Sequence, residues 1–158
     1  MIFVTVGAQM SFDRLIGWVD DWAESVGRDD LVAQIGPSDY VPQRLKVLPF
    51  LTPPEFRSRI AEADFVIAHA GMGSIIEALE LATPIVVVPR LGSLGETRND
   101  HQVATARRLT EEGLVLSAQS PEELAEQLAI VGTGGFRAHI SDHAQTPLLN
   151  RLRGFAEA

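Results

Sequence analysis

The fold of this chain is decided by the stretch His69-Ala70-Gly71-Met72-Gly73-Ser74. An apolar run at 64–70 leads into it and is typical of a strand covered on both faces, while a helical pattern at 73–82 follows. A glycine-rich turn between a buried strand and a helix leaves backbone N–H groups unpaired at the positive end of the helix dipole. Because phosphate is the usual ligand of such a turn, the sequence predicts an anion-binding site here.

Composition limits the classes to which the protein can belong. The chain has 158 residues, 46% of them hydrophobic, which is enough for one domain with a buried core. A formal net charge of −8 argues against broad nucleic-acid binding and against a polybasic membrane surface, although local groups can still hold a small anion. The chain has no cysteine, which excludes disulfides and thiolate metal sites. Met1 leads directly into an apolar run without the basic stretch of a signal peptide, and no apolar run approaches the roughly 20 residues that span a bilayer. We therefore expect a cytoplasmic protein.

Short apolar runs alternate with helical patterns along the chain. The runs expected to form strands are Ile2–Val6, Leu31–Ile35, Leu45–Phe50, Phe65–Ala70, Ile85–Val88 and Leu114–Ser117. Helices are expected after a cap at Ser11, from Pro53, after the glycine turn, from Asn99 or Asp100, after a cap at Ser120 and over Pro147–Ala158. This alternation predicts an α/β, Rossmann-like three-layer domain with a parallel six-stranded sheet.

Three loops of unusual composition follow expected strands, namely Gly7-Ala8-Gln9, Ala70–Ser74 and Arg90–Asp100. In a parallel sheet, ligands bind at the carboxyl ends of the strands, near the topological switch point. We therefore expect the ligand where these loops meet. A glycine-rich joint at 132–135 separates the ligand-binding domain, residues 1–131, from a C-terminal tail, residues 132–158.

Three side chains at the turn each have two interpretations. Ser74 and Glu77 lie on one side of the helix at about 100° per residue, so Ser74 suits a phosphate and Glu77 suits a ribose diol. The two residues could instead serve only the helix itself, by capping its first turn and by placing a negative charge near the positive end of its dipole. His69 ends a buried strand, where a histidine is usually a hydrogen-bonded core residue. Its place against the turn also lets it donate to a diphosphate oxygen.

Two further segments carry polar candidates. The loop at 91–98 is either an ordinary surface loop with an Asx cap on the next helix or a mobile rim that faces sugar hydroxyls. His139 and His143 have the spacing of helical metal ligands. However, no third ligand is evident, and the segment lies beyond the apparent core. We therefore expect no metal site.

Three segments together resemble the C-terminal domain of the family 28 glycosyltransferases. They are the turn at 69–74 with Glu77, the pair Pro84 and Pro89, and the run Asn99-Asp100-His101-Gln102. In that family the domain is the nucleotide-sugar-binding half of a GT-B enzyme. The resemblance covers residues 1–131. The short length and the opening Phe3-Val4-Thr5-Val6-Gly7 further resemble small soluble subunits of split enzymes, both exopolysaccharide or capsule subunits and the N-acetylglucosaminyltransferase subunit of dolichol-linked glycan synthesis.

The resemblance implies a donor site for a UDP-sugar, with a hexose or a hexuronic acid as the sugar. The turn would meet the diphosphate with His69 beside it, Glu77 would hold the ribose, and the residues at 101 and 102 would contact the sugar. Arg90 and Arg98 flank the last loop and could match a hexuronate carboxylate. The implied donor-binding set is Gly7, Ala8, His69, Gly71, Met72, Gly73, Ser74, Glu77, Arg90, Asn99, His101 and Gln102. The family usually has Asp-Asn-His-Gln where this chain has Asn99-Asp100, which leaves the roles of these two positions open.

The resemblance also implies a mechanism and partners. An acceptor hydroxyl attacks the anomeric carbon, and the leaving diphosphate is stabilised by N–H groups and hydroxyls, with no obligatory metal or other cofactor. The catalytic base and a lipid-linked saccharide acceptor are expected on a membrane-anchored partner subunit, which would keep this chain at the inner face of the membrane. The isolated chain could form a homo-oligomer. The tail either docks on the partner or the membrane, or closes the domain's own sheet.

Two other functions stay open at the level of sequence. One is a non-catalytic, regulatory module that binds a nucleotide-sugar. The other is a small hydrolase with His69 or His101 as its base, although neither a matched nucleophile nor an orienting acid is evident.

Overall fold

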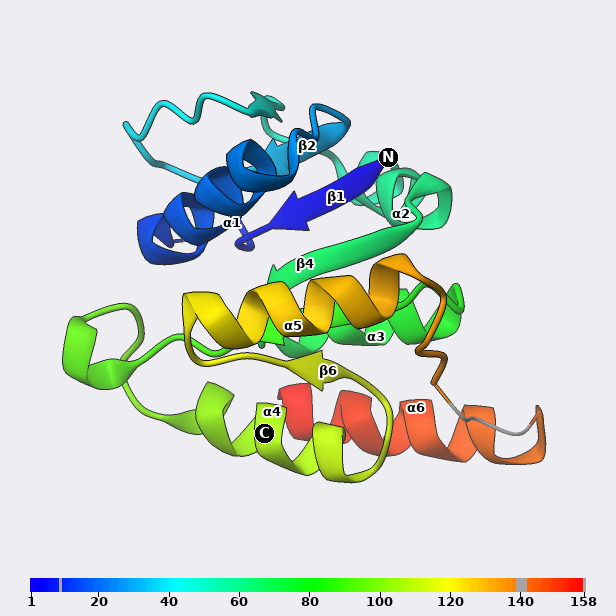
Figure 1. Ribbon diagram of the computed structural model, residues 1–158. Coiled ribbons are helices and arrows are strands. Elements are labelled where there is room, and N and C mark those ends of the chain that lie inside the picture. The colour runs from blue at the N-terminus through cyan, green and yellow to red at the C-terminus, as the bar shows by residue number, and fades with distance from the viewer. Residues whose placement is uncertain (9, 139–141, 158) are drawn as a thin grey trace.

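The computed structural model of the chain describes residues 1–8, 10–138 and 142–157. Its centre is a six-stranded parallel sheet in the order β3-β2-β1-β4-β5-β6 (Figure 1). The strands are β1 (Ile2–Thr5), β2 (Leu31–Gln34), β3 (Leu45–Val47), β4 (Phe65–His69), β5 (Ile85–Val88) and β6 (Leu116–Ser117). The helices are α1 (Asp13–Val26), α2 (Pro53–Glu62), α3 (Met72–Glu80), the 3-10 helix η1 (Gly92–Leu94), α4 (His101–Glu111), α5 (Pro121–Gly132) and α6 (Asp142–Glu157). The predicted fold class is confirmed.

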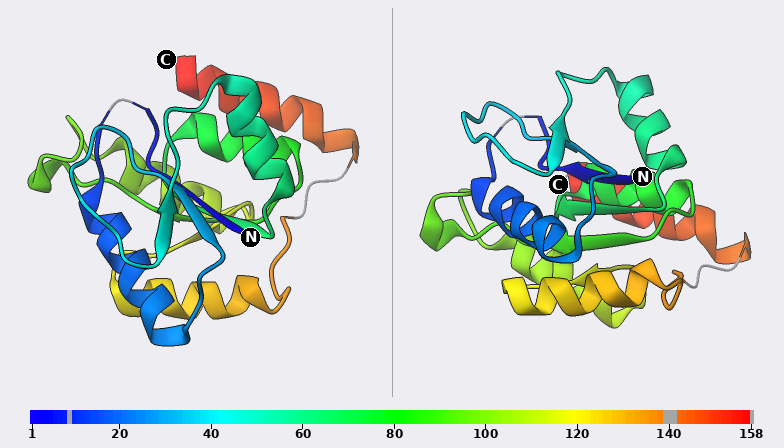
Figure 2. Two further views of the ribbon diagram at one scale, coloured as in Figure 1. Left: turned by 90° about the horizontal axis from the view of Figure 1, so that it is seen from above. Right: turned by 45° about the horizontal axis from the view of Figure 1, so that its top comes forward.

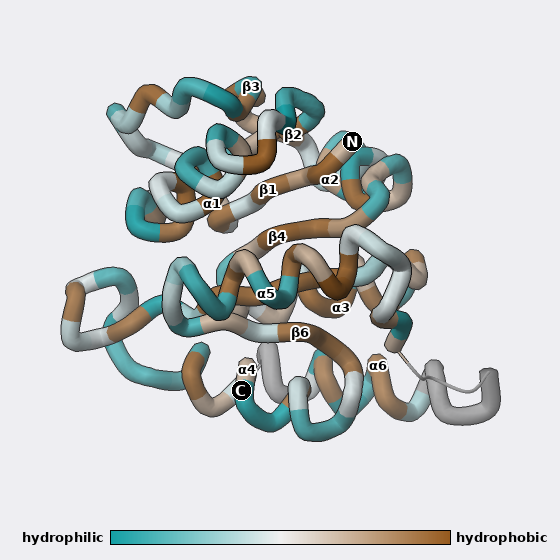
Figure 3. The backbone as a smooth tube through the Cα atoms, viewed as in Figure 1, coloured by the Kyte–Doolittle hydropathy of each residue, from teal (hydrophilic) through white to brown (hydrophobic). Residues whose placement is uncertain are grey.

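The central strands are apolar because both of their faces are covered. Every residue of β1 and β5 is buried, as are the first four residues of β4. β1 lies between β2 and β4, with Ile2 opposite Leu31 on one side and Phe65 on the other. Figure 3 shows β1 and β4 as hydrophobic segments, whereas the helices around them alternate between hydrophobic and hydrophilic residues. Strands of this kind lack the alternation of a half-exposed strand.

Helices cover both faces of the sheet (Figure 2). α1 and α5 pack on one face, where Leu15 and Leu128 join the core. α2, α3 and α4 contribute Ile60, Ile75 and Leu109 to the core of the other face. The three-layer arrangement predicted from the alternation of strands and helices is therefore present.

The described part of the C-terminal tail contributes side chains to the core. α6 packs against α3, and the side chains of Leu149 and Leu152 are buried in the same core cluster as those of α3. The expected start at Pro147 is wrong, because α6 begins at Asp142. The proline lies inside the helix, where its missing N–H removes one hydrogen bond. His139, of the histidine pair noted in the sequence, lies outside the described residues.

One of the two predicted serine caps is confirmed. The Oγ of Ser120 accepts a hydrogen bond from a backbone N–H of the first turn of α5. The cap at Ser11 is wrong, because α1 begins at Asp13 and the residue before it is Phe12, whose buried ring cannot cap a helix. The carbonyl of Ser11 instead accepts a hydrogen bond from Arg90 at 2.8 Å.

Several predicted boundaries also differ. α3 starts at Met72 and ends at Glu80 rather than covering 73–82, and Ala82 has a φ of 55°, a left-handed conformation that cannot continue the helix. The sequence pattern also predicts a buried stripe of Leu15, Val19, Trp22 and Val26 on the first helix. In the structure Ala23 of α1 is buried, while Val26 is exposed. β3 and β6 are shorter than the predicted runs. Within the described ranges, no helix combines the length and the apolar character that a membrane span requires.

Candidate functional site

The strand order reverses between β1 and β4, since β2 and β3 lie beyond β1 while β5 and β6 lie beyond β4. The loops after these strands open into a cavity of about 1370 Å³. In parallel sheets, this switch point is where ligands bind. The lining contains every residue of the predicted binding set except Arg90. Gln9, from the loop after β1, lies outside the described residues.

The start of α3 forms one wall of the cavity. Gly71 precedes the helix in an extended conformation, with φ −88° and ψ 136°, and no side chain caps the helix. The first helical hydrogen bond joins the N–H of Ile75 to the carbonyl of Gly71 at 3.2 Å. The N–H groups of Met72, Gly73 and Ser74 therefore have no partner within the helix. The Ser74 side chain is buried, and its hydroxyl makes no hydrogen bond within the described part of the chain. Free N–H groups at the positive end of a helix dipole form a receptor for an anion.

The imidazole of His69 occupies the space between two glycines. A Cβ on Gly71 would overlap the ring, 2.6 Å from Nε2, and a Cβ on Gly7 would lie 3.0 Å from the same nitrogen. Gly7 also has a φ of 80°, which favours glycine. Glycine at these two positions therefore lets Nε2 of His69 lie beside the loops of both switch-point strands.

The other ring nitrogen of His69, Nδ1, faces two side chains. The Nε2 of Gln102 lies 3.3 Å from it and the Nε of Arg90 lies 3.5 Å from it. The Oε1 of Gln102 accepts hydrogen bonds from the backbone N–H groups of Ala70 at 3.1 Å and Arg90 at 3.0 Å. Burial and the nearby Arg90 guanidinium lower the pKa of His69 from 6.5 to about 4, so the ring is neutral at pH 7. We expected the carboxamide of Gln102 to contact a sugar. In the structure it instead bonds to the backbone at the ends of β4 and β5 and lies against His69.

Arg90 holds the loop after β1 rather than facing the cavity. Its side chain is 4% exposed and does not line the cavity. Burial lowers the pKa of Arg90, and the charge of Glu96 opposes this shift. The expected contact between Arg90 and a donor does not fit this position. Its guanidinium donates to the backbone carbonyls of Val6, Met10, Ser11 and Glu96.

The loop at 91–98 is fixed to the rest of the domain. Arg14, on α1, donates to both carboxylate oxygens of Glu96 at 3.0 Å. The same carboxylate accepts the N–H of Leu91 at 3.0 Å, and Asp100 accepts the N–H of Gly92 at 3.0 Å. None of the residues at 91–98, all of which are described, lines the cavity. These contacts and the absence of 91–98 from the cavity lining agree with the interpretation as a surface loop, although the cap expected on α4 is not formed.

Three further predicted residues lie on the cavity wall, namely Glu77, Asn99 and His101. The Glu77 carboxylate forms an ion pair with Arg57 of α2, which also contacts Glu80 at 2.9 Å. The Oδ1 of Asn99 accepts the N–H of His101 at 3.0 Å, which forms an Asx turn before α4, whereas the N-cap residue of α4, Asp100, makes no side-chain cap hydrogen bond. The carboxylate of Glu77, paired with the guanidinium of Arg57, therefore lies about one turn into α3.

The sequence interpretation missed an apolar wall formed by the segment that leads into α2. Phe50, Leu51, Pro53 and Phe56 line the cavity, and Phe50 is 76% exposed. An exposed aromatic ring beside an anion site offers a flat apolar face to a planar ligand. Its position at the end of the expected strand Leu45–Phe50, at the same edge of the sheet as the glycine turn, is the signal that could have identified it.

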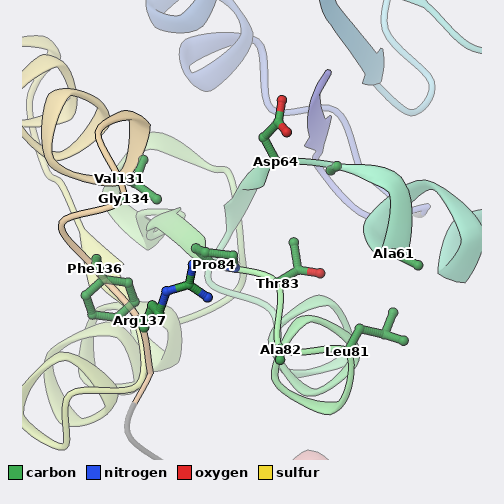
Figure 4. A pocket seen from close by; sticks show the side chains of 11 residues that line it. Ala61, Asp64, Leu81, Ala82, Thr83, Pro84, Val131, Gly134, Phe136 and Arg137 are labelled. Carbon is green, nitrogen blue, oxygen red and sulfur yellow. The ribbon is translucent and has the colours of Figure 1, made fainter.

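A second cavity, of about 300 Å³, lies at the opposite edge of the sheet, before β4 and β5 (Figure 4). Two polar side chains on its wall already have partners, since Asp64 binds the N-terminal amine at 2.7 Å and Thr83 donates to the carbonyl of Ile60 at 3.0 Å. No predicted binding residue lies there. Across the described ranges, no group of three or more histidine, aspartate or glutamate side chains is arranged for a metal ion.

Comparison with known proteins identifies the family. Residues 1–138 match the model of the glycosyltransferase family 28 C-terminal domain. The chain belongs to this family. It is 37% identical over 122 residues to the Homo sapiens UDP-N-acetylglucosamine transferase subunit ALG13, a match that covers 71% of this chain. The match covers 10% of the human protein, so the chain spans a small part of that relative's length.

Solved structures share the fold of this family 28 domain. MurG from Acinetobacter baumannii aligns with a TM-score of 0.64 at 19% identity, covering 96% of this chain and 49% of that chain. The NMR solution structure of ALG13 aligns with a TM-score of 0.64 at 23% identity, covering 96% of this chain and 93% of that chain. The Rossmann-like domain described above therefore corresponds in fold to about half of the MurG chain.

Proposed function

We propose that the cavity binds the diphosphate and nucleoside of a UDP-sugar, and that the chain is the donor-binding half of a two-component glycosyltransferase. The start of α3 carries this proposal, because unpaired backbone N–H groups, the hydroxyl of Ser74 and Nε2 of His69 lie along one wall. A diphosphate needs several donors close together. A helix start supplies them without a cation.

The remaining wall suits a nucleoside. The Glu77 carboxylate lies one turn beyond the anion site and can accept hydrogen bonds from the two hydroxyls of a ribose. Its ion pair with Arg57 offsets part of its negative charge, which reduces repulsion of a neighbouring diphosphate. The exposed ring of Phe50 offers a face on which a uracil ring can stack.

A second subunit completes the proposed enzyme. The chain corresponds to 49% of the MurG chain, and its human relative is named a transferase subunit. In the transfer, the acceptor hydroxyl attacks the anomeric carbon, the bond to the diphosphate breaks, and a base takes the hydroxyl proton. We assign that base and the site for a lipid-linked saccharide acceptor to a membrane-anchored partner. Binding to this partner would keep the chain at the inner face of the membrane.

UDP-N-acetylglucosamine is the first donor to test, because the name of the human relative specifies it. A hexose or hexuronic acid for exopolysaccharide synthesis is the alternative. The argument for a hexuronate relied on Arg90 and Arg98, and neither residue lines the cavity. A competition between UDP-N-acetylglucosamine, UDP-glucose and UDP-glucuronate therefore decides the sugar.

Calorimetric titration of the purified chain with UDP, ADP and GDP tests the binding step. We expect UDP to bind most tightly, and Glu77→Gln to weaken UDP binding about tenfold, since a lost polar contact costs about 1–3 kcal/mol. Glu80→Gln is the matched control, because Glu80 also pairs with Arg57 but does not line the cavity. Equal affinities for the three nucleotides, or no binding of UDP at millimolar concentration, would contradict the proposal.

A non-catalytic nucleotide-sugar-binding module is the second candidate function. It is favoured by Nδ1 of His69, which faces two N–H donors and so cannot take a proton from an acceptor. The same observation gives no support to a small hydrolase with His69 as its base. Release of UDP from the donor, measured with the chain alone and with partner and acceptor added, separates the candidates. Transfer only in the complete mixture supports the two-component enzyme, whereas binding without transfer in that mixture supports the module.

A further inference from the structure

The side chain of Gln102 bridges the ends of β4 and β5 in an orientation fixed by hydrogen-bond chemistry. One of its terminal atoms lies 3.1 Å from the backbone nitrogen of Ala70 and 3.0 Å from that of Arg90. Both backbone nitrogens carry hydrogen and can only donate, so the atom between them is the amide oxygen. The amide nitrogen therefore takes the other position, 3.3 Å from Nδ1 of His69.

This orientation determines which ring nitrogen of His69 carries the proton. The amide nitrogen of Gln102 only donates, and so does Nε of Arg90, which lies 3.5 Å from the same Nδ1. Nδ1 is therefore an acceptor. In a neutral imidazole the hydrogen then resides on Nε2. That nitrogen is the one that lies beside Gly7 and Gly71 at the wall of the cavity.

We infer that Gln102 is a positioning residue that holds His69 as the Nε2–H tautomer, so that the ring presents an uncharged N–H donor to a phosphate oxygen in the cavity. The nature of the ligand rests on the proposed function, whereas the tautomer does not. Gln102 accepts hydrogen bonds from the N–H groups of Ala70, the first residue after β4, and Arg90, the second residue after β5. One side chain thus couples the spacing of the two strand ends to the orientation of the ring.

Burial and the Arg90 guanidinium favour the neutral form of the ring. Arg90, from the end of β5, contacts Nδ1 and opposes a second positive charge. Glu77 on α3 and His101 on α4 line the same cavity, and Arg57 of α2 pairs with Glu77. The described residues of the loop after β1, 6–8 and 10–11, bring no charged side chain. Binding of a phosphate through Nε2–H therefore needs no protonation of the ring.

Two-bond ¹⁵N–¹H NMR correlation of the histidine rings in the full chain tests the tautomer without any ligand. The chain has 4 histidines, and the spectrum of His69→Gln identifies the signals of His69. We expect a protonated Nε2 and an unprotonated Nδ1, unchanged between about pH 5.5 and pH 8, because the ring is held neutral. A protonated Nδ1, averaged tautomers, or titration near the ordinary histidine pKa would overturn the inference.

Gln102→Glu tests whether Gln102 determines the tautomer of His69. A carboxylate oxygen can still accept the N–H groups of Ala70 and Arg90, but the other oxygen cannot donate to Nδ1. We expect Nδ1 of His69 to become protonated in this variant. Asn99→Asp is the matched control, because it makes the same chemical change on the same cavity at a residue whose side chain accepts the N–H of His101. Its His69 ring is expected to keep the wild-type pattern. An unchanged ring in Gln102→Glu would contradict the positioning role.

Titration of both variants with UDP connects the tautomer to binding. We expect UDP affinity to fall at least fivefold further in Gln102→Glu than in Asn99→Asp at pH 8. Equal losses would show that Gln102 does not act through His69. A wild-type chain that shows the Nε2–H ring but does not bind UDP would contradict the proposed function and leave the tautomer assignment intact. A chain that binds UDP with a protonated Nδ1 would contradict the tautomer assignment and leave the proposed function intact.

Discussion

Arg90, at the end of β5, places its guanidinium carbon 4.9 Å from the ring centroid of Phe12, the residue that precedes α1. This contact closes the loop after β1 against the loop after β5. The same guanidinium donates to the carbonyl oxygens of Val6 and Met10. A single side chain thereby holds the backbone on both sides of Gly7, which lines the cavity. The loop that lines the cavity is held by a residue that does not line it.

Replacing Arg90 with methionine is expected to lower the free energy of unfolding by about 3 kcal/mol, because one buried and three partly buried carbonyl oxygens lose their donor. Chemical denaturation measures the change. Arg98→Met is the matched control, since Arg98 is an exposed arginine on the same loop and its loss should change stability by less than about 0.5 kcal/mol. Equal losses in the two variants would show that the hydrogen bonds of Arg90 contribute no net stability.

The sequence predicted the sheet and the uncapped helix start after the glycine turn because both have local signals. Continuous apolar runs indicate buried parallel strands, and the glycine turn after β4 marks the start of a helix. The role of Arg90 has no such signal. Its partners at Val6, Met10 and Ser11 are distant along the chain, and only the folded sheet brings them together. An arginine beside a polar loop was therefore interpreted as a ligand contact.

Replacing Gly71 with alanine is expected to displace the imidazole of His69, because the added Cβ would overlap the ring. We expect a loss of about 1–3 kcal/mol in the free energy of unfolding, as for other overpacked sites, and weaker binding of UDP. Gly73→Ala is the control, because a Cβ there meets nothing within 4 Å and alanine favours the helix. Thermal denaturation of both variants checks the contrast. A Gly71→Ala protein as stable as Gly73→Ala would mean that the ring can move without cost.

Gln102 shows why the candidate site was only partly predictable. Its place in the run 99–102 and its position on the cavity wall followed from the sequence and the resemblance. The direction of its carboxamide did not, because it depends on how closely the ends of β4 and β5 approach. The same applies to Phe50, whose exposure follows from the path of the segment before α2. Sequence patterns identify the residues at a strand end, but the distances between strand ends decide what those residues contact.

Stability is expected to decrease as the pH falls from about 6.5 toward about 4, in part because of His69. The pKa of His69 is lowered to about 4 in the folded protein, so the unfolded chain takes up the proton first. The contribution is complete above the ordinary pKa of 6.5 and is lost as the pH falls through the folded value, with a slope of at most about 1.4 kcal/mol per pH unit. Urea denaturation of wild type and His69→Gln across this pH range measures the contribution of His69 to the free energy of unfolding.

The difference between these two proteins isolates His69 from other titrating groups. Asp30, for example, has a pKa lowered by its hydrogen bond with Arg28, and its contribution is lost at lower pH in both proteins. If the two proteins lost stability in parallel from about pH 6.5 to about pH 4.5, the ring would not be held neutral by the fold.

Replacing Leu152 with alanine tests whether the C-terminal helix belongs to the domain. Leu152 of α6 is 2% exposed, lies in the same core cluster as the buried residues of α3, and also lines the cavity. We expect a loss of about 2–4 kcal/mol in the free energy of unfolding, as for other buried leucines. Leu94→Ala, at an exposed leucine of η1, is expected to change stability by less than about 0.5 kcal/mol. If α6 served only to dock on a partner, Leu152→Ala would leave the stability of the isolated chain unchanged and would weaken the complex alone.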